Sequence, residues 1–441
     1  MNKIHPCKVS DFLSRLDINQ LGKQTGFTLR KPKKITAELF IVSFFNVMLK
    51  KCYSLRQWAI EVSLLTGKPV SFQAIAKKLQ FRQLRFIKAL LLKGLDEQLD
   101  SDYFRWSKSN GDLFKRILIE DSTCIQLPHS LSQYYPGNRR QNGPKKAVAR
   151  IQLCLDLLSN SFKNLDLKSF CDHDATHSTE ILNYLKQGDL VLRDLGYSKI
   201  SVFRSIIEFK AYFISRLHPK WVVLDADNEK LIDLMKELKD FDRRNIHVFD
   251  RAVKIGRSEK FPVRIVCLKL SQKQAQIRRR KACRNGNRKR SVSQVTSYLL
   301  GWNILVTNLD KNQIKPTELY KLYSLRWHIE MIFKNWKSYF KIADIFTSCQ
   351  GKNYAKPEYL LYLCMCFLVF IYNPRFNHFK RTILLKSGKI LSPAKFAKMT
   401  INNLDMLLKK EAPLLIELLQ KNCCYAIRKD RQNIYERILY I

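Results

Sequence analysis

The stretch YSLRWHIEMIFKNWK, from Tyr323 to Lys337, carries the most specific pattern in the chain. Read as one helix at about 100° per residue, it places Tyr323, Arg326, Glu330 and Lys337 in a band about 60° wide. The neighbouring sector is apolar and holds Leu322, Leu325, Ile329, Ile332, Phe333 and Trp336, while Lys321, Ser324, His328 and Asn335 fall on the far side. The pattern predicts a helix that packs on a core and carries a polar stripe at its edge.

The chemistry of this stripe allows two interpretations. A carboxylate can bind a hard divalent metal, and the flanking Arg and Lys can hold phosphate oxygens. The alternative is an amphipathic surface helix with incidental ion pairs, because Arg326 and Glu330 form an ordinary i,i+4 pair. The helix by itself does not decide between them.

The composition indicates a large, strongly basic protein. The chain has 441 residues, enough for two or three domains, and 79 Lys plus Arg oppose 38 Asp plus Glu, for a formal net charge of +41. So large an excess repels itself unless a polyanion is near. Nucleic acid is therefore the expected partner, ahead of a membrane surface or an acidic protein.

Cysteine usage and hydropathy indicate a cytoplasmic protein. The 12 cysteines form no CxxC pair and no Cys/His array with zinc spacing, which is typical of reduced thiols. The N-terminal sequence MNKIHPCKVSDFL has no apolar signal region. The longest apolar run, Tyr359–Tyr372, is shorter than the roughly 20 residues that span a bilayer, so we expect a buried core helix that ends at Asn373 and Pro374.

The region from Phe40 to Leu99 predicts a small all-helical domain. Ser71 could cap a helix FQAIAKKLQF, followed after a short break by RQLRFIKALLLKGL. The basic residues expected to face outward are Lys77, Lys78, Arg82, Arg85 and Lys88. Both a helix-turn-helix and a plain helical bundle with a basic surface fit this pattern.

From Phe114 the pattern changes to strands. The segments KRILIEDSTCIQLP, AVARIQLCLDLLSN and SFKNLDLKSF predict three successive antiparallel strands. Asp121 lies inside the first strand, where a carboxylate must be paired, solvated at an edge, or bound to a metal. Its neighbour Glu120 points to the opposite face.

A second candidate carboxylate follows the next strand. A helix from about Ser178 to Lys186 leads to GDLVLRDLGYSKI, in which an apolar strand ends at Asp194. Open α/β sheets present their ligands at such carboxyl ends. Asp189 is a competing candidate, but it begins the strand and is better explained as a turn residue.

Together these motifs resemble those of the bacterial insertion-sequence transposases of the IS-four family. The spacing Tyr, two residues, Arg, three residues, Glu, six residues, Lys resembles the family signature, while Asp-Ser-Thr at Asp121 and Asp-Leu-Gly-Tyr at Asp194 resemble its two aspartate motifs. The resemblance implies that Asp121, Asp194 and Glu330 bind two Mg²⁺ ions, with Mn²⁺ as an alternative.

The resemblance also implies DNA-binding roles. Tyr323, Arg326 and Lys337 would hold phosphates near the cleaved end, and Arg216, near the end of the strand AYFISRL, would contact the transposon end. Trp302 resembles in position an aromatic residue on which a flipped base stacks. The alternative is that Trp302 is a core tryptophan that begins a strand.

The expected fold is α/β, with an RNase H-like catalytic core that is interrupted by a mostly-β insertion domain and flanked by helical regions. The strand-like segments WVVLDAD, NIHVFDRAVKI and FPVRIVCLKL lie in the insertion, and LLGWNILVTNL returns to the core sheet. The expected divisions are 1–110, a helical DNA-binding domain; 111–217 and 301–374, the two parts of the core; 218–300, the insertion; and 375–441, a helical C-terminal region. The run Arg278–Arg290 holds eight cations and suits phosphate contact, or is a solvated basic loop.

The expected function is metal-dependent cut-and-paste transposition of double-stranded DNA at terminal inverted repeats and a target, by a homodimer without membrane contact. The alternatives are an RNase H-like nuclease and a catalytically inactive DNA-binding derivative of a transposase. His173 and His177 could suggest a metal site, but a structural or capping role is the preferred interpretation because no HExxH arrangement follows.

Overall fold

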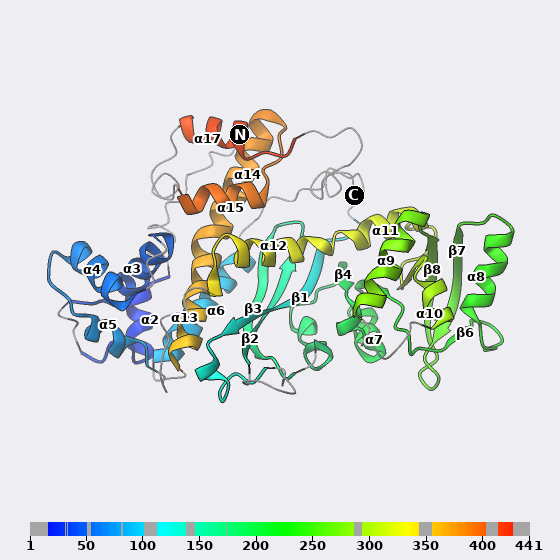
Figure 1. Cartoon of the computed structure of the whole chain (residues 1–441), viewed down its shortest axis with the longest axis horizontal. Helices are drawn as coiled ribbons and strands as arrows, with labels where there is room; N and C mark the ends of the chain where they lie inside the picture. Colours follow the sequence, from blue (N-terminus) through cyan, green and yellow to red (C-terminus); the bar gives the residue numbers. More distant parts are fainter. Residues whose placement is uncertain are drawn as a thin grey trace. The chain divides into compact units, whose positions relative to one another are not determined.

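The computed structural model describes residues 16–30, 32, 34–50, 54–80, 83–100, 113–137, 146–172, 174–285, 293–343, 355–402 and 413–426 (Figure 1). The chain divides into two compact units. The first unit contains Met1–Trp106, Asp121–Asp172 and His328–Glu436, and the second contains Ser107–Glu120, His173–Trp327 and Arg437–Ile441. The boundary between Trp327 and His328 falls within the stretch Tyr323–Lys337, so its polar residues belong to different units.

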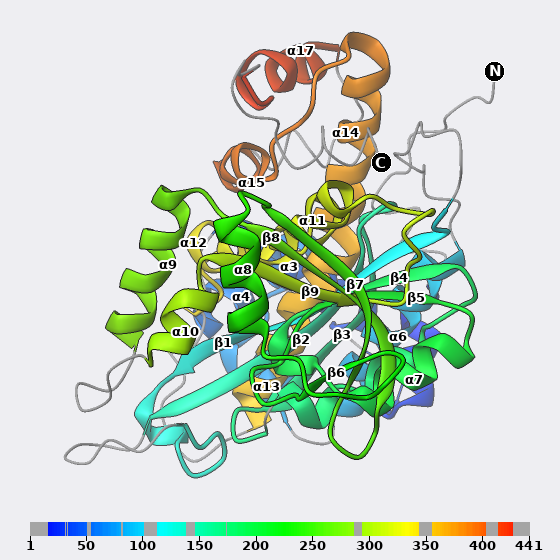
Figure 2. The same ribbon diagram turned by 90° about the vertical axis from the view of Figure 1, so that its right-hand side faces the viewer.

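The second unit is built on a mixed β-sheet (Figure 2). In sheet order its strands are the first part of β1 (Arg116–Leu127), then β4 (Asp189–Arg193), β5 (Tyr212–Arg216), β9 (Trp302–Thr307), β8 (Phe261–Lys269), β7 (Val248–Ile255) and β6 (Val223–Asp225). β1 pairs with β4 in parallel and β4 with β5 in parallel, whereas the remaining pairs are antiparallel. The expected strands before Asp194 and Arg216, and the return of 302–307 to the sheet, are confirmed.

Helices cover this sheet. α7 (Ile200–Glu208) packs on β5, α8 (Leu234–Arg243) packs on β7, and α11 (Pro316–Ser324) packs on β5 and β8. The segment 218–300 also contains α9 (Gln272–Asn285) and α10 (Gln294–Leu299), so its described residues form as many helices as strands and differ from the mostly-β expectation. The basic run is helical as far as Asn285, because Gln, Lys, Arg and Ala favour helix, and the part of the run after Asn285 lies outside the described residues.

The helix expected from Ser178 to Lys186 is wrong. The structure has only a 3₁₀ turn at Glu180–Asn183. The carbonyl oxygen of Ser178, which would accept the first helical bond, instead accepts a bond of 2.7 Å from the Arg193 guanidinium. The backbone N–H of Leu182 bonds to the Thr179 carbonyl at 3.1 Å, which is the tighter 3₁₀ pattern.

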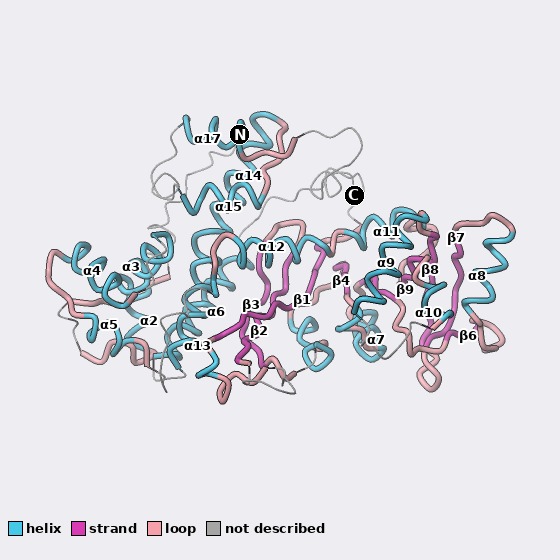
Figure 3. The backbone as a smooth tube through the Cα atoms, in the orientation of Figure 1, coloured by secondary structure: helices cyan, strands magenta, loops and turns pink. Residues whose placement is uncertain are grey.

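The first unit combines a β-hairpin with helices (Figure 3). β2 (Ala147–Asp156) and β3 (Ser161–Ser169) pair antiparallel, as expected. In the part of this unit that the structure describes, the helices are α2 (Ile18–Gln24), α3 (Ala37–Lys50), α4 (Leu55–Thr66), α5 (Phe72–Lys78), α6 (Leu84–Asp100), α12 (Trp327–Ser338), α13 (Ala355–Phe367), α14 (Asn373–Ser387), α15 (Pro393–Asn402) and α17 (Pro413–Asn422). The all-helical region is confirmed, and the Ser71 hydroxyl caps α5 by accepting from the backbone N–H of Ala74 at 3.3 Å.

The exposure expected for the basic residues of α5 and α6 is confirmed in part. Lys77 and Arg85 are exposed, whereas Lys78 and Lys88 are half-buried, and Arg82 lies outside the described residues. Lys78 donates to the Phe27 carbonyl oxygen at 2.7 Å, and Lys88 forms an ion pair of 2.8 Å with Glu358.

A long apolar helix lies at the centre of the first unit. α13 continues through one π-helical turn, Leu368–Tyr372, into α14, so the expected end at Asn373 and Pro374 is wrong. The π turn lets Pro374, which has no N–H to donate, lie in the first turn of α14 without breaking the helix. Pro357–Ser387 is the one helix in the described part of the chain that is long and apolar enough to cross a membrane, but 94% of its most apolar window is buried inside the protein, as in a core helix.

This helix lies close to α6 at Gly94. A Cβ atom at position 94 would lie 1.8 Å from Cε1 of Phe370. We expect Gly94→Ala to lower the free energy of unfolding by about 1–3 kcal/mol, the usual cost of overpacking a core. Chemical denaturation would measure it, with Leu92→Ala as the control, because Leu92 is exposed on the same helix. Equal stability of the two variants would show that α6 and the π turn are not in close contact.

Candidate functional site

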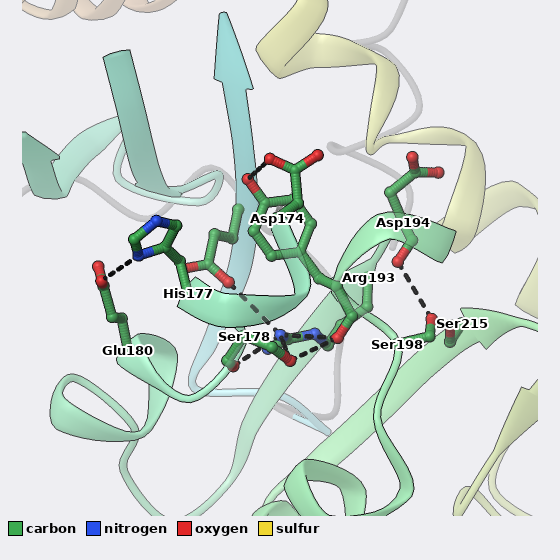
Figure 4. Close-up of polar contacts among 10 residues, drawn as sticks. Asp174, His177, Ser178, Glu180, Arg193, Asp194, Ser198 and Ser215 are labelled. Carbon is green, nitrogen blue, oxygen red and sulfur yellow. Dashed lines mark hydrogen bonds and ion pairs between the residues drawn. The ribbon is translucent and has the colours of Figure 1, made fainter. Parts of the chain in front are cut away.

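The candidate site in the second unit starts at the carboxyl end of the parallel strands β4 and β5. Asp194 follows β4 directly, and Arg216 is the last residue of β5. Since Arg193 is opposite Ser215 in the parallel register, the two side chains leave the same edge of the sheet. The Ser198 hydroxyl donates to the Asp194 carbonyl oxygen at 3.1 Å and is 2.7 Å from the Ser215 hydroxyl, so the loop is tied to both strands (Figure 4).

Beneath Asp194, the buried Arg193 fixes the end of β4 (Figure 4). One nitrogen of its guanidinium donates to the Ser178 carbonyl oxygen at 2.7 Å, to the Ser178 hydroxyl at 2.8 Å and to the Tyr197 carbonyl oxygen at 3.0 Å. The same nitrogen lies 3.6 Å from Oε2 of Glu120, which is also buried. Glu120 therefore balances a structural cation.

Tyr323 and Arg326 approach Asp194 from the end of α11. The Arg326 Nε atom lies 3.7 Å from Oδ1 of Asp194, and the side chain of Asp194 is 37% exposed. The phenol of Tyr323 is buried and donates to the Arg193 carbonyl oxygen at 3.3 Å. Burial raises the pKa of Tyr323, while the charges of Arg216 and Arg326 act in the opposite direction. The Arg216 guanidinium lies 5.8 Å from the centre of the Tyr323 ring.

The stretch Tyr323–Lys337 is two helices rather than one. The backbone N–H groups of Leu325 and Arg326 bond to carbonyls three residues earlier, at 3.0 and 3.1 Å, before α12 begins at Trp327. The Ser324 hydroxyl also donates to the carbonyl oxygen of Lys321 at 2.6 Å and so competes with the helical pattern. The break brings Tyr323 and Arg326 to Asp194, while Glu330 and Lys337 belong to α12 of the first unit.

In the first unit, Asp121 and Glu330 are both half-buried. Oδ1 of Asp121, in β1, accepts from the backbone N–H of Ser122 at 2.8 Å. The apolar sector predicted for the helix is buried, as expected, but the far side is not all exposed. His328 and Asn335 are buried, because Asn160 and Phe376 cover that side of α12.

A network of amides supports α12 at His328. Nε2 of His328 lies 3.2 Å from Oδ1 of Asn160, and the Asn160 amide donates to Asn373 at 3.0 Å and to Asn377 at 2.9 Å. Burial lowers the pKa of His328 to about 3, with a further contribution from the neighbouring Lys380. The helix that carries Glu330 is therefore built around a neutral imidazole.

This burial predicts a loss of stability in acid. The unfolded chain protonates His328 below about pH 6.5, but the folded protein does so only near pH 3. Between these values the unfolded state binds more protons, so the free energy of unfolding should fall as the pH falls, by up to about 1.4 kcal/mol per pH unit. Denaturation of the wild type and His328→Gln from pH 7 to 4 would measure the difference, and His247→Gln removes an exposed histidine as the control. Parallel pH profiles for the wild type and His328→Gln would contradict the prediction.

The remaining predicted residues have mixed outcomes. Trp302 begins β9 and is 3% exposed, as the alternative of a core tryptophan predicts. Asp189 is buried at the start of β4, where it accepts a bond of 2.9 Å from Nε of Arg116 and one of 2.7 Å from the backbone N–H of Lys186, so it has a structural role. His177 pairs with Glu180 at 2.8 Å, while His173 lies outside the described residues.

The structure also shows a candidate residue that the sequence analysis missed. Trp327, directly after Arg326, is 54% exposed. A large indole in contact with solvent beside a cationic site is suited to stacking on a base. Its signal in the sequence is an indole that falls outside the predicted apolar sector of the helix.

The donor chemistry of the three candidate carboxylates fits a hard divalent ion, because each supplies carboxylate oxygens. Within the described ranges, no group of three His, Cys, Asp or Glu side chains is placed to hold a metal. Asp121 and Glu330 belong to the first unit and Asp194 to the second, so metal binding by the three together stays a prediction.

Comparison with known proteins identifies relatives. A family model described as the transposase DDE domain matches residues 112–357. The chain is 27% identical to a transposase of insertion sequence element IS231B from Bacillus thuringiensis subsp. berliner, over 95% of this chain and 91% of the relative. It is 28% identical to a transposase of IS1151 from Clostridium perfringens, over 75% of this chain and 72% of the relative. A solved structure titled as a piggyBac transposase synaptic complex with hairpin DNA aligns with 96% of this chain and 84% of its own, at a TM-score of 0.43 and 9% identity.

Proposed function

The chain belongs to the DDE transposase family and is a DNA transposase of the insertion-sequence type, and we propose that it excises and reinserts its own element by metal-dependent phosphoryl transfer. The observation that carries the proposal is Asp194, a partly exposed carboxylate at a strand end, held beside Arg326 and near Tyr323. A carboxylate with adjacent guanidiniums is the combination that a metal-bound phosphodiester requires.

We infer that the catalytic core is RNase H-like. What supports this is the order of elements β1, β2, β3, β4, α7 and β5, with β1, β4 and β5 adjacent and parallel and with β2 and β3 as an antiparallel hairpin. The strands β6, β7 and β8 and the helices α8, α9 and α10 would then be an insertion between β5 and β9. In this scheme Asp194 follows the second parallel strand of the core.

Asp121, Asp194 and Glu330 would hold two Mg²⁺ or Mn²⁺ ions. When bound, such ions activate the attacking oxygen and stabilise the leaving oxygen of an in-line displacement at phosphorus. Arg216 and Arg326 would hold phosphate oxygens beside Asp194, and Lys337 would hold a phosphate from the exposed side of α12. Tyr323 would position the guanidiniums of Arg216 and Arg326. Its ring faces Arg216, and its phenol bonds to Arg326 and to the carbonyl of Arg193.

The proposed partners are double-stranded DNA at the terminal inverted repeats, a DNA target, and a second copy of this chain in the synaptic complex. The high positive charge supports the DNA partner, because neutralising phosphates releases counterions. The homodimer rests on the family resemblance alone.

The direct test is cleavage of a duplex that carries the inverted repeat flanking the coding sequence. We expect Mg²⁺-dependent nicking at the repeat boundary and strand transfer into plasmid DNA, both abolished by EDTA. Glu330→Ala and Asp121→Ala should lose at least about 100-fold in cleavage rate, because each removes a proposed metal ligand. Both variants should still bind the duplex.

Glu318→Gln is the matched control. Glu318 is an exposed carboxylate on α11, and the side-chain oxygen of Gln can accept the same bond in the helix cap. Cleavage by Glu330→Ala at the wild-type rate would remove Glu330 from the proposed ligand set. Nicking without strand transfer would favour the alternative of a nuclease, and specific binding without nicking would favour an inactive derivative.

Trp327 provides a separate prediction. If its exposed indole stacks on an unpaired base near the cleaved end, Trp327→Ala should lower the cleavage rate by about 5- to 150-fold, the equivalent of the roughly 1–3 kcal/mol of one stacking contact. Trp327→Phe should retain most of the activity. Fluorescence of 2-aminopurine placed at successive positions near the boundary would locate the base, and wild-type fluorescence and cleavage in Trp327→Ala would exclude the contact.

A further inference from the structure

Arg278, on the basic helix α9, contacts the start of β9. The Arg278 guanidinium donates to the Trp302 carbonyl oxygen at 3.2 Å and to the side-chain oxygen of Asn303. These bonds use two of the five N–H donors of the group. By contrast, Arg280 and Arg284 are exposed to solvent on the same helix.

The register of the sheet places Arg278 close to the candidate site. Arg216, at the end of β5, is opposite Leu305, and the backbone N–H of Leu217 bonds to the Ile304 carbonyl at 3.1 Å. The start of β9, to which Arg278 is bonded, therefore lies beside the end of β5. Burial lowers the pKa of Arg278, and the charge of Arg216 lowers it further, although a guanidinium remains protonated at neutral pH.

The charges of three guanidiniums thus act on the Tyr323 phenol. Arg216 lies 5.8 Å from its centre, Arg326 bonds to its phenol, and Arg278 interacts electrostatically with both Tyr323 and Arg216. Asp194 balances part of this charge through Arg326. Like charges in a partly buried site repel more strongly than in water, and a phosphate diester would relieve that repulsion by accepting bonds from more than one guanidinium.

We propose that Arg278 is a third phosphate-positioning residue of this site, acting with Arg216 and Arg326 on a backbone phosphate of the transposon end. The inference rests on the proposed function and adds a residue of the inserted segment to the DNA-binding group. Arg278 is fixed in place by its bonds to β9, so it presents a rigid cation, whereas the exposed arginines of α9 are free to follow the duplex.

Replacing single phosphates of the DNA by neutral methylphosphonates would test this contact. Duplexes of the terminal inverted repeat, each with one methylphosphonate at a successive position, are bound by the protein in EDTA, where no cleavage occurs. For the wild type we expect affinity to fall about 10-fold at the phosphate that Arg278 contacts, as for a charge-assisted bond of about 1.4 kcal/mol. Arg278→Gln should show a smaller loss at that phosphate than the wild type, because only Arg216 and Arg326 would still contact it, and its salt slope should be smaller by about 0.9.

The matched control is Arg280→Gln, which removes an exposed cation two residues further along α9 and should keep the full loss at that phosphate. Asn303→Ala separates charge from anchoring, because it removes one partner of Arg278 but keeps the guanidinium. Asn303→Ala should therefore retain sensitivity to the same methylphosphonate, and this arm holds even where Arg278→Gln fails to fold.

Full methylphosphonate sensitivity in folded Arg278→Gln, or loss of the sensitive position in Asn303→Ala, would show that Arg278 only anchors α9 and would overturn the inference. The proposed function would survive that result, because repeat-specific binding and cleavage by the wild type are measured independently. A wild-type protein that does not bind the repeat at all would overturn both.

Discussion

The position of Asp194 depends on the buried guanidinium of Arg193. Burying a cation is costly unless it is paired and bonded, and here Glu120 and the backbone oxygens of Ser178 and Tyr197 supply the partners. Because Arg193 is the last residue of β4, every bond that it makes also fixes the backbone from which Asp194 projects. The Tyr323 phenol bonds to the carbonyl of this same residue, so one buried cation holds both the carboxylate and the end of α11.

Local side-chain bonds also explain the break between α11 and α12. A continuous helix would satisfy more backbone bonds, yet Ser324 bonds to the preceding turn and Arg326 pairs with Asp194. The chain can therefore leave the second unit with Tyr323 and Arg326 fixed there. It then begins α12, where His328 is locked into the amide network of the first unit. The signature stretch connects the two units, and its residues serve different local environments rather than one helical stripe.

The sequence predicted the strands well and the detailed environment of side chains poorly, for a physical reason. Apolar strands such as β1 and β4 are specified by their own residues, and an aspartate directly after such a strand has to leave at its carboxyl end. The expected helix at Ser178 failed because the partner of its carbonyl, Arg193, is 15 residues away in sequence. Helical periodicity assigns one buried face, so it could not show that the face of α12 with His328 and Asn335 is also covered by Asn160 and Phe376.

The guanidiniums near Tyr323 show how folding can fix cations in place before a phosphate binds. Arg216 and Arg278 lie in each other's field, and the second loses hydration by its burial, so folding accepts an unfavourable electrostatic arrangement there. It is tolerated because Arg278 is bonded to β9 and Arg326 to Asp194, which prevents these cations from moving apart. A phosphate that enters such a site meets donors whose orientation has already been fixed, and it also removes repulsion that the free protein contains. In the proposed phosphate contact, part of the affinity would then arise from relief of electrostatic repulsion, which an exposed basic helix surface, solvated and free to relax, cannot supply.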